Sequence, residues 1–129
     1  MLYMVIIFDI KSSKQLSNRE DVQYKLIDAI KKANKDYSSI IASNFIITLG
    51  DEWQGLLKYP CDYQKIIDFF NENFKNLKIY CGIGIGVISI NNFELTVNQL
   101  DGPAFYLARN AIKIAKQKNI SLVVLKDWP

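Results

Sequence analysis

Apolar and polar positions alternate along the chain in segments that predict strands and helices in turn. The first of these segments, residues 3–8, is a continuous apolar run rich in β-branched side chains, typical of a strand covered on both faces. Other segments show apolar residues at the three- and four-residue spacing of an amphipathic helix. The predicted strands are 3–8, 45–49, 52–57, 77–90 and 121–125, and the predicted helices are 18–35, 62–74 and 104–118.

The order of these elements predicts the fold class. It reads βαββαβ followed by an αβ unit, and the first six elements match the split, ferredoxin-like motif. We therefore expect one α/β (α+β) domain over residues 1–129, with an antiparallel-rich sheet and helices on one face. The pattern assigns no element to residues 91–101, where a short hairpin or a flap is expected.

Composition excludes several kinds of chemistry. The chain has 129 residues, a net charge of +3 with dispersed lysines, and no histidine. The missing histidine rules out histidine-based catalytic triads and leaves zinc without its usual ligand, so any metal should be a hard ion bound by oxygen. Cys61 and Cys81 lie far apart and are expected to be reduced, in a cytoplasmic protein. The mild charge argues against nucleic-acid binding by this chain alone, and residues 1–10 are too short to span a membrane.

Two carboxylates are candidates for a metal site. In a split βαβ sheet the first and third strands are antiparallel neighbours, so Asp9 should lie beside the Gly50-Asp51 turn. Two neighbouring carboxylates repel each other, and a bound Mg²⁺ or Mn²⁺ would relieve that repulsion. Glu52 is a possible third ligand or a general base. The alternative is that these acids are ordinary turn residues, with Asp9 capping the loop that follows it.

The residues after Asp9 are candidates for phosphate binding. Lys11, Ser12, Ser13 and Lys14 offer amides, hydroxyls and ammonium groups that can cradle a triphosphate, although an ordinary solvated loop has the same composition. Arg109, on the third predicted helix, either reaches a phosphate or belongs to a solvated stripe.

Aromatic and glycine positions leave two further alternatives open. Three aromatic residues either stack on a nucleotide base or belong to the core or an interface: Trp53, Tyr80 and Tyr106. Alternating Gly82, Gly84 and Gly86 leave one strand face bare, either for a base or ribose or for a tightly packed helix.

Several motifs, taken in order, resemble known families. The strings FDIKSSK, ITLGDEWQGLL, GIGIG and DGPAFYLAR are similar to sequence blocks of the SatD family and span most of the chain. Their order and spacing also resemble the class III nucleotidyl cyclases. Residues 49–53, LGDEW, resemble the GGDEF signature of diguanylate cyclases and the GGDD turn of CRISPR-type palm polymerases, although Leu49 replaces the first glycine.

The resemblance implies a cyclase-like palm fold with two-metal phosphoryl chemistry. Its expected metal ligands are Asp9, Ile10 and Asp51, and the cofactor is Mg²⁺ or Mn²⁺. The expected catalytic residues are Asp9, Asp51, Glu52 and Arg109. The expected nucleotide-binding residues are Ile10, Lys11, Ser12, Ser13, Lys14, Gly50 and Tyr106.

The resemblance also implies a reaction and partners. The ligand would be a nucleoside triphosphate or a cyclic nucleotide, the product a cyclic nucleotide or oligonucleotide signal, and the assembly a homodimer with sites at its interface. One departure favours a different function: the catalytic asparagine of class III cyclases is lost or shifted, near Tyr106. The alternative is a non-catalytic nucleotide-sensing or dimerisation module of the SatD type in stress or defence regulation. SatD relatives often continue into a C-terminal helix-turn-helix, which is not expected here because the chain stops at Pro129.

Overall fold

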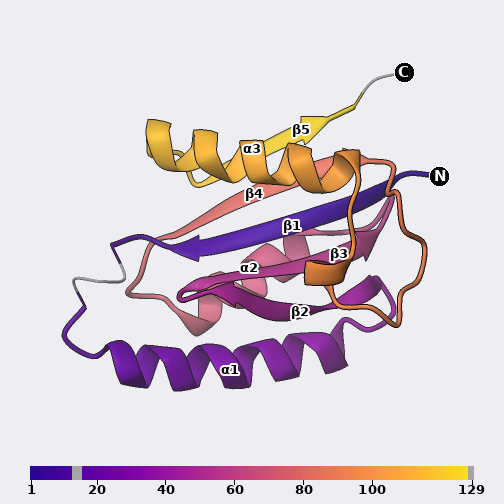
Figure 1. Cartoon of the computed structure of the whole chain (residues 1–129). Coiled ribbons are helices and arrows are strands. Elements are labelled where there is room, and N and C mark those ends of the chain that lie inside the picture. Colours follow the sequence, from indigo (N-terminus) through magenta and orange to yellow (C-terminus); the bar gives the residue numbers. More distant parts are fainter. Residues whose placement is uncertain (13–15, 128–129) are drawn as a thin grey trace.

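The computed structural model describes residues 1–12 and 16–127 and confirms the predicted order of elements (Figure 1). Between β4 and α3 a longer segment contains the short 3₁₀ helix η2. In chain order the elements are β1 (Tyr3–Ile10), α1 (Arg19–Asp36), β2 (Ile41–Leu49), β3 (Glu52–Lys58), α2 (Gln64–Asn73), β4 (Ile79–Gly86), η2 (Val97–Gln99), α3 (Pro103–Lys118) and β5 (Leu122–Lys126).

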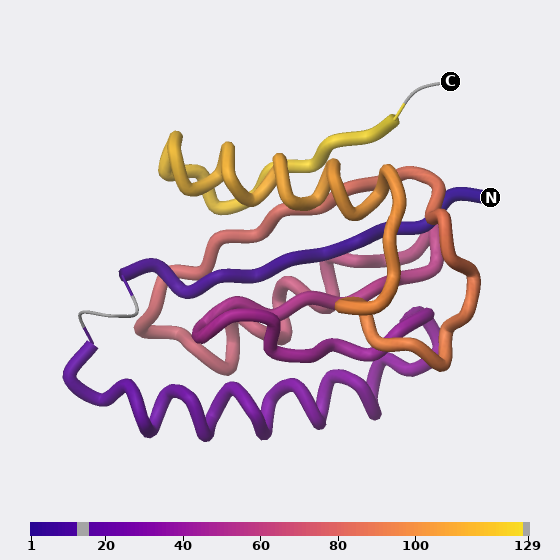
Figure 2. The backbone as a smooth tube through the Cα atoms, viewed as in Figure 1, coloured from indigo at the N-terminus to yellow at the C-terminus, as the bar shows by residue number. Residues whose placement is uncertain are grey.

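A five-stranded sheet with the order β2-β3-β1-β4-β5 forms the middle of the molecule. The apolar first strand is central and pairs antiparallel with both β3 and β4, as the ferredoxin-like core requires. The added αβ unit places β5 parallel to β4 at the sheet edge. Figure 2 shows the chain path, in which the end of β1, the β2–β3 turn and the end of α3 all reach one end of the sheet.

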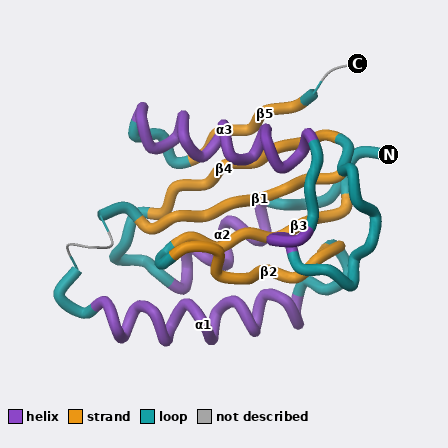
Figure 3. Tube along the Cα trace, viewed as in Figure 1, coloured by secondary structure: helices purple, strands orange, loops and turns teal. Residues whose placement is uncertain are grey.

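Helices cover both faces of the sheet, which corrects the expectation that they lie on one face (Figure 3). Helices α1 and α2 pack with alternate β1 residues, among them Met4, Ile6 and Phe8, in one core cluster. The intervening residues Val5 and Ile7 pack with α3 in a second cluster. Because successive strand residues point to opposite faces, a strand that is apolar at every position needs cover on both sides.

The glycine-rich strand β4 lies directly under α3, which decides between the two interpretations of its bare face. A Cβ atom added at Gly84 would lie 2.3 Å from both the Ala104 carbonyl oxygen and the Ala108 backbone nitrogen. One added at Gly82 would lie 2.3 Å from the backbone nitrogen of Ile112. The glycines therefore let the helix backbone approach the sheet, and the hypothesis that this face receives a base or ribose is wrong.

Some element boundaries differ from the prediction for identifiable reasons. β4 ends at Gly86 although the apolar pattern continues to Ile90, because the chain then leaves the sheet and Val87 and Ile90 are exposed. β2 begins at Ile41, and irregular pairing with β3 disturbs the alternation that predicts a strand. Within residues 91–101 the structure has η2 and no strand, so a hairpin there is excluded.

Candidate functional site

A row of polar side chains crosses the sheet at the end of β1. Asp9 is the direct register partner of Glu52 on β3 and of Tyr80 on β4. Directly paired residues of antiparallel strands project their side chains from the same face. This face is the one covered by α3, so the last turns of that helix lie over the row.

The β2–β3 turn brings Asp51 to the same end of the sheet. Gly50 has a φ of +41°, a backbone conformation that glycine adopts without steric cost, and the Ile10 amide donates to the Asp51 carbonyl oxygen at 3.3 Å. The turn is thus joined to the end of β1. The convergence of Asp9 with the Gly50-Asp51 turn, expected from topology, is present in the structure.

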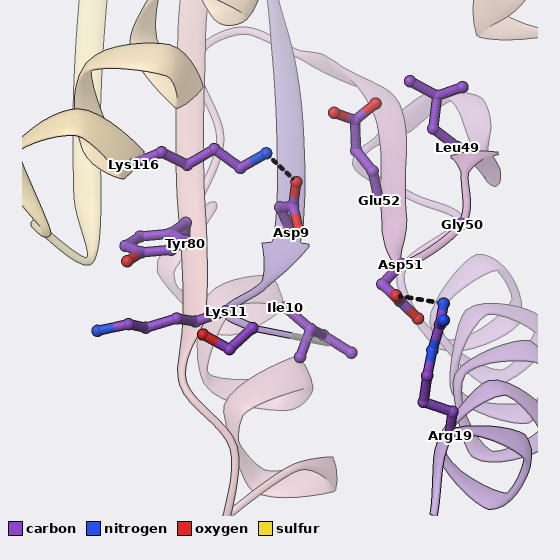
Figure 4. A pocket seen from close by; sticks show the side chains of 11 residues that line it. Asp9, Ile10, Lys11, Arg19, Leu49, Gly50, Asp51, Glu52, Tyr80 and Lys116 are labelled. Carbon is purple, nitrogen blue, oxygen red and sulfur yellow. Dashed lines mark hydrogen bonds and ion pairs between the residues drawn. The ribbon is translucent and has the colours of Figure 1, made fainter. Parts of the chain in front are cut away.

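Each of the three acids has a basic partner from a helix. The Lys116 ammonium group of α3 contacts the Asp9 carboxylate, and Arg19, the first residue of α1, contacts Asp51 at 3.3 Å. Arg109 of α3 forms two hydrogen bonds to Glu52, at 2.6 and 3.1 Å. Figure 4 shows the first two pairs, with Lys116 turned toward Asp9 and Arg19 toward Asp51.

Glu52 is the most fully bonded of the acids. Its side chain is 5% exposed, and the Thr48 hydroxyl donates a further hydrogen bond to it at 2.5 Å. Burial raises the pKa of Glu52, but the hydrogen bonds from Arg109 and Thr48 outweigh burial and hold the pKa below its ordinary value. A carboxylate bound in this way is poorly suited to accept a proton as a general base.

Asp9 lies in a less favourable electrostatic environment. Burial raises its pKa above the ordinary value, and the nearby charges of Glu52 and Asp51 raise it further, while Lys116 opposes both effects. The carboxylates therefore interact through space. An additional cation among them would lower the free energy of the charged form of Asp9.

An open cavity of about 640 Å³ lies at this end of the sheet and joins these groups (Figure 4). Acids and bases from four elements face it, together with the backbone of the β2–β3 turn. Its lining residues are Asp9, Ile10, Lys11, Ser12, Arg19, Leu49, Gly50, Asp51, Glu52, Tyr80 and Lys116.

The donor set fits a divalent cation that arrives with a phosphate. Mg²⁺ is usually held by one or two carboxylates together with phosphate oxygens and water, and Asp9 and Asp51 supply that number. Over residues 1–12 and 16–127, no three acidic, cysteine or histidine side chains are grouped closely enough to hold a metal by themselves. A cation without its anion must also displace Lys116 and Arg19 from the two carboxylates.

The structure brings some of the expected nucleotide-binding residues together and separates others. Ile10, Lys11, Ser12 and Gly50 line the cavity. Tyr106 does not line it; its side chain is exposed, and its hydroxyl donates to Asp101 at 3.1 Å. Arg109 is not a lining residue either, since its guanidinium group is bound to Glu52. Two of the expected residues lie outside the described part of the chain: Ser13 and Lys14.

The other two aromatic candidates are buried. Trp53 is 0% exposed and stacks on Phe8 with ring centroids 5.3 Å apart, so it belongs to the core. Tyr80 is 6% exposed, and its hydroxyl donates to the Asn119 side-chain oxygen at 2.9 Å. Neither ring is available as an open stacking platform.

Sequence reasoning missed Lys116 and Arg19, the two residues that contact Asp9 and Asp51. One signal was available for Lys116, which lies seven residues, or two helical turns, after Arg109 and so on the same helix face. No comparable signal pointed to Arg19. Its contact with Asp51 depends on where the β2–β3 turn meets the start of α1.

No helix in the described part of the chain has the length and apolar character needed to cross a membrane.

Comparison with known families gives a match over most of the chain. The profile of the SatD family matches residues 3–121. A search among curated proteins finds no match.

Solved structures with a similar fold are nucleotide cyclase and GGDEF domains. A bacterial light-regulated adenylyl cyclase superimposes with a TM-score of 0.64 at 13% identity, covering 95% of this chain and 74% of that one. A microbial GGDEF domain studied with cyclic di-GMP gives a TM-score of 0.61 at 16% identity, with 96% and 79% covered. The adenylyl cyclase CyaB from P. aeruginosa gives 0.57 at 15% identity, with 88% and 71% covered. At these identities the similarity establishes the fold alone.

Proposed function

The chain belongs to the SatD family and has the palm fold of nucleotide cyclases, and we propose that it binds a nucleoside triphosphate together with Mg²⁺ or Mn²⁺. The ligand's phosphates would occupy the cavity at the end of β1. The observation that carries this proposal is the convergence of Asp9 and Asp51 on one cavity that is also lined by lysine and arginine side chains. Such a cavity can bind a cation and a polyphosphate at the same time.

Asp9, Asp51 and the backbone carbonyl of Ile10 would hold the divalent ion. When bound, the ion would neutralise phosphate charge and make a ribose hydroxyl easier to deprotonate. The basic side chains that pair with these two carboxylates would then have to change partners. Lys116 and Arg19, each about half exposed, are free to turn from the carboxylates toward phosphate oxygens. Metal and nucleotide would then favour each other's binding.

In the enzymatic form of this proposal, the domain converts a nucleoside triphosphate into a cyclic nucleotide or an oligonucleotide. Positioning and charge neutralisation would supply most of the rate enhancement, as in other phosphoryl transfers. The test is to incubate the protein with each nucleoside triphosphate and Mn²⁺ and to separate the products by chromatography. Asp51→Ala should lose product formation, whereas Asp28→Ala, which changes an exposed acid on α1, should retain it.

A second candidate function is nucleotide sensing without turnover, and the position of Arg109 favours it. This arginine, expected to be catalytic, is held by two hydrogen bonds to Glu52 of its own chain. A sensor would bind nucleotide and metal and release the nucleotide unchanged. Binding without product, lost in Asp51→Ala, would support the sensor, and product that requires Arg109 would exclude it.

We further propose that the domain acts as a homodimer with the cavity near the interface. One large apolar side chain supports this arrangement: Leu49 in the cavity wall is 70% exposed. An exposed apolar group beside a polar cavity is common where a second protein surface covers it.

A further inference from the structure

Beside the cavity, three hydrogen-bond donors converge on one neutral oxygen. The ammonium groups of Lys11 and Lys78 donate to the side-chain oxygen of Asn119, at 3.1 and 2.9 Å. The Tyr80 hydroxyl donates to the same oxygen at 2.9 Å. Asn119 follows the last turn of α3 with a φ of +54°, and this conformation holds its side chain where the three donors meet.

This arrangement has more donors than one amide oxygen can satisfy well. A carbonyl oxygen offers two lone pairs and no net charge, whereas two of the three donors are cations. The two ammonium groups also repel each other across the oxygen. A phosphate group in their place would offer several charged oxygens and would remove that repulsion.

The charge balance of the surrounding cavity also favours a bound anion. Asp9, Asp51 and Glu52 already have their own basic partners. In the described part of the chain, neither Lys11 nor Lys78 has a carboxylate within 4.0 Å. These two lysines therefore give this side of the cavity an excess of positive charge. That charge can attract an anion without the help of a metal ion.

The backbone fixes the position of the cluster relative to the cavity. The Lys11 amide donates to the Lys78 carbonyl oxygen at 2.8 Å, which ties the end of β1 to the start of β4. Lys11 and Tyr80 also line the cavity, and Figure 4 shows both side chains extending away from Asp51. The cluster thus lies on the β4 side, and the β2–β3 turn lies on the other.

We propose that Lys11, Lys78 and Tyr80 form a polyphosphate subsite that binds without a divalent cation. Asn119 positions the three donors when no anion is present. For a nucleotide, the subsite takes the terminal phosphates, and this part rests on the function proposed above. Binding of inorganic tripolyphosphate depends on the subsite alone, so the two proposals can fail separately.

The test is a calorimetric titration of the full chain with sodium tripolyphosphate, in EDTA and at low ionic strength, where exposed charges are little screened. The wild type should bind. Lys78→Ala and Lys11→Ala should each weaken binding by about tenfold, the effect of losing one charge-assisted hydrogen bond. Tyr80→Phe, which keeps the ring, should weaken it less.

The matched control is Lys65→Ala, which removes the same charge from an exposed position on α2. If Lys65→Ala weakens binding as much as Lys78→Ala, the attraction comes from net charge and the subsite is wrong. Absence of tripolyphosphate binding by the folded wild type would also overturn it. The lysines would then serve only to neutralise the negative end of the α3 dipole. Circular dichroism spectra of each variant confirm that a loss of binding is not a loss of folding.

Discussion

Lys116 and a divalent cation would compete for the same carboxylate. The ammonium group already neutralises part of the Asp9 charge, and burial still holds the pKa of Asp9 above its ordinary value. A metal ion alone must therefore displace a favourable partner, whereas a metal that arrives with phosphates offers Lys116 a new one. This exchange would explain how a site with internal ion pairs could bind a metal ion together with a nucleotide.

Lys116→Met is expected to increase the affinity of the nucleotide-free protein for Mn²⁺ by about tenfold, because Asp9 loses its competing cation. The same change should weaken binding of a nucleoside triphosphate in the presence of Mn²⁺, since it removes the contact proposed between Lys116 and a phosphate. Electron paramagnetic resonance titration measures free Mn²⁺ directly. Lys113→Met, an exposed position on the same helix, is the control. An unchanged or weaker Mn²⁺ affinity in Lys116→Met would contradict the exchange.

Arg109 is expected to stabilise the fold through Glu52. Arg109→Met leaves a buried carboxylate without two of its hydrogen bonds, which should lower the free energy of unfolding by about 1–3 kcal/mol at pH 7. The pKa of Glu52 is lowered in the folded state, so its stabilising contribution exists above the unfolded pKa and is lost as pH falls.

The difference in unfolding free energy between wild type and Arg109→Met should therefore shrink as pH falls below about 4.3, the ordinary pKa of glutamate. Urea titrations at pH 7 and at pH 4 measure it. A difference that does not change with pH would show that Arg109 stabilises the fold by packing rather than through the charge of Glu52.

At the scale of elements, the close contact between α3 and β4 positions the site. The glycines of β4 let the helix backbone lie directly on the sheet, and the same helix carries Arg109 and Lys116 to the polar row. A change in the helix-to-sheet distance should therefore alter both stability and the ion pairs.

Gly84→Ala is expected to lower the free energy of unfolding by about 3 kcal/mol, because the new Cβ would meet helix backbone that cannot move locally. Gly86→Ala is the matched control. Its nearest new contact is 3.2 Å, so a small shift can accommodate it. Urea denaturation of both variants provides the comparison. Equal losses in the two would refute the close-approach argument.

The sequence predicts the elements better than it predicts their contacts. The continuous apolar run of β1 and the helical spacing of α1 and α3 depend on local pattern, and all three elements are found. The end of β4 could not be located, because Val87 and Ile90 are apolar yet exposed. The choice between helix and ligand over the bare face of β4 required the position of α3.

For the site, too, the sequence predicts the strands better than it predicts the contacts made by the helices. The convergence of Asp9 and Asp51 follows from strand order and was predictable from the sequence. Their partners Lys116 and Arg19 come from helices whose rotation and tilt no local pattern specifies. The exposed position of Tyr106 also depends on the rotation of α3.

At the scale of the whole molecule, the proposed homodimer makes a distinct prediction. If Leu49 lies in the interface, Leu49→Lys should shift the protein from dimer to monomer, because it places a charge in an apolar contact. Tyr24→Lys changes a side chain that is 62% exposed on α1 and should have no effect. Sedimentation velocity over a range of concentrations reports the assembly. A wild-type monomer throughout that range would refute the dimer.

We have proposed that Asp9 and Asp51 make this palm domain a metal-dependent nucleotide site. The most direct test is a thermal unfolding experiment with each of the four nucleoside triphosphates, with and without Mn²⁺, on wild type, Asp51→Ala and Asp28→Ala. At least one nucleotide should raise the unfolding temperature of wild type and Asp28→Ala only when Mn²⁺ is present, and Asp51→Ala should lose this increase. An unchanged unfolding temperature in wild type under all conditions, or an equal increase in Asp51→Ala, would contradict it.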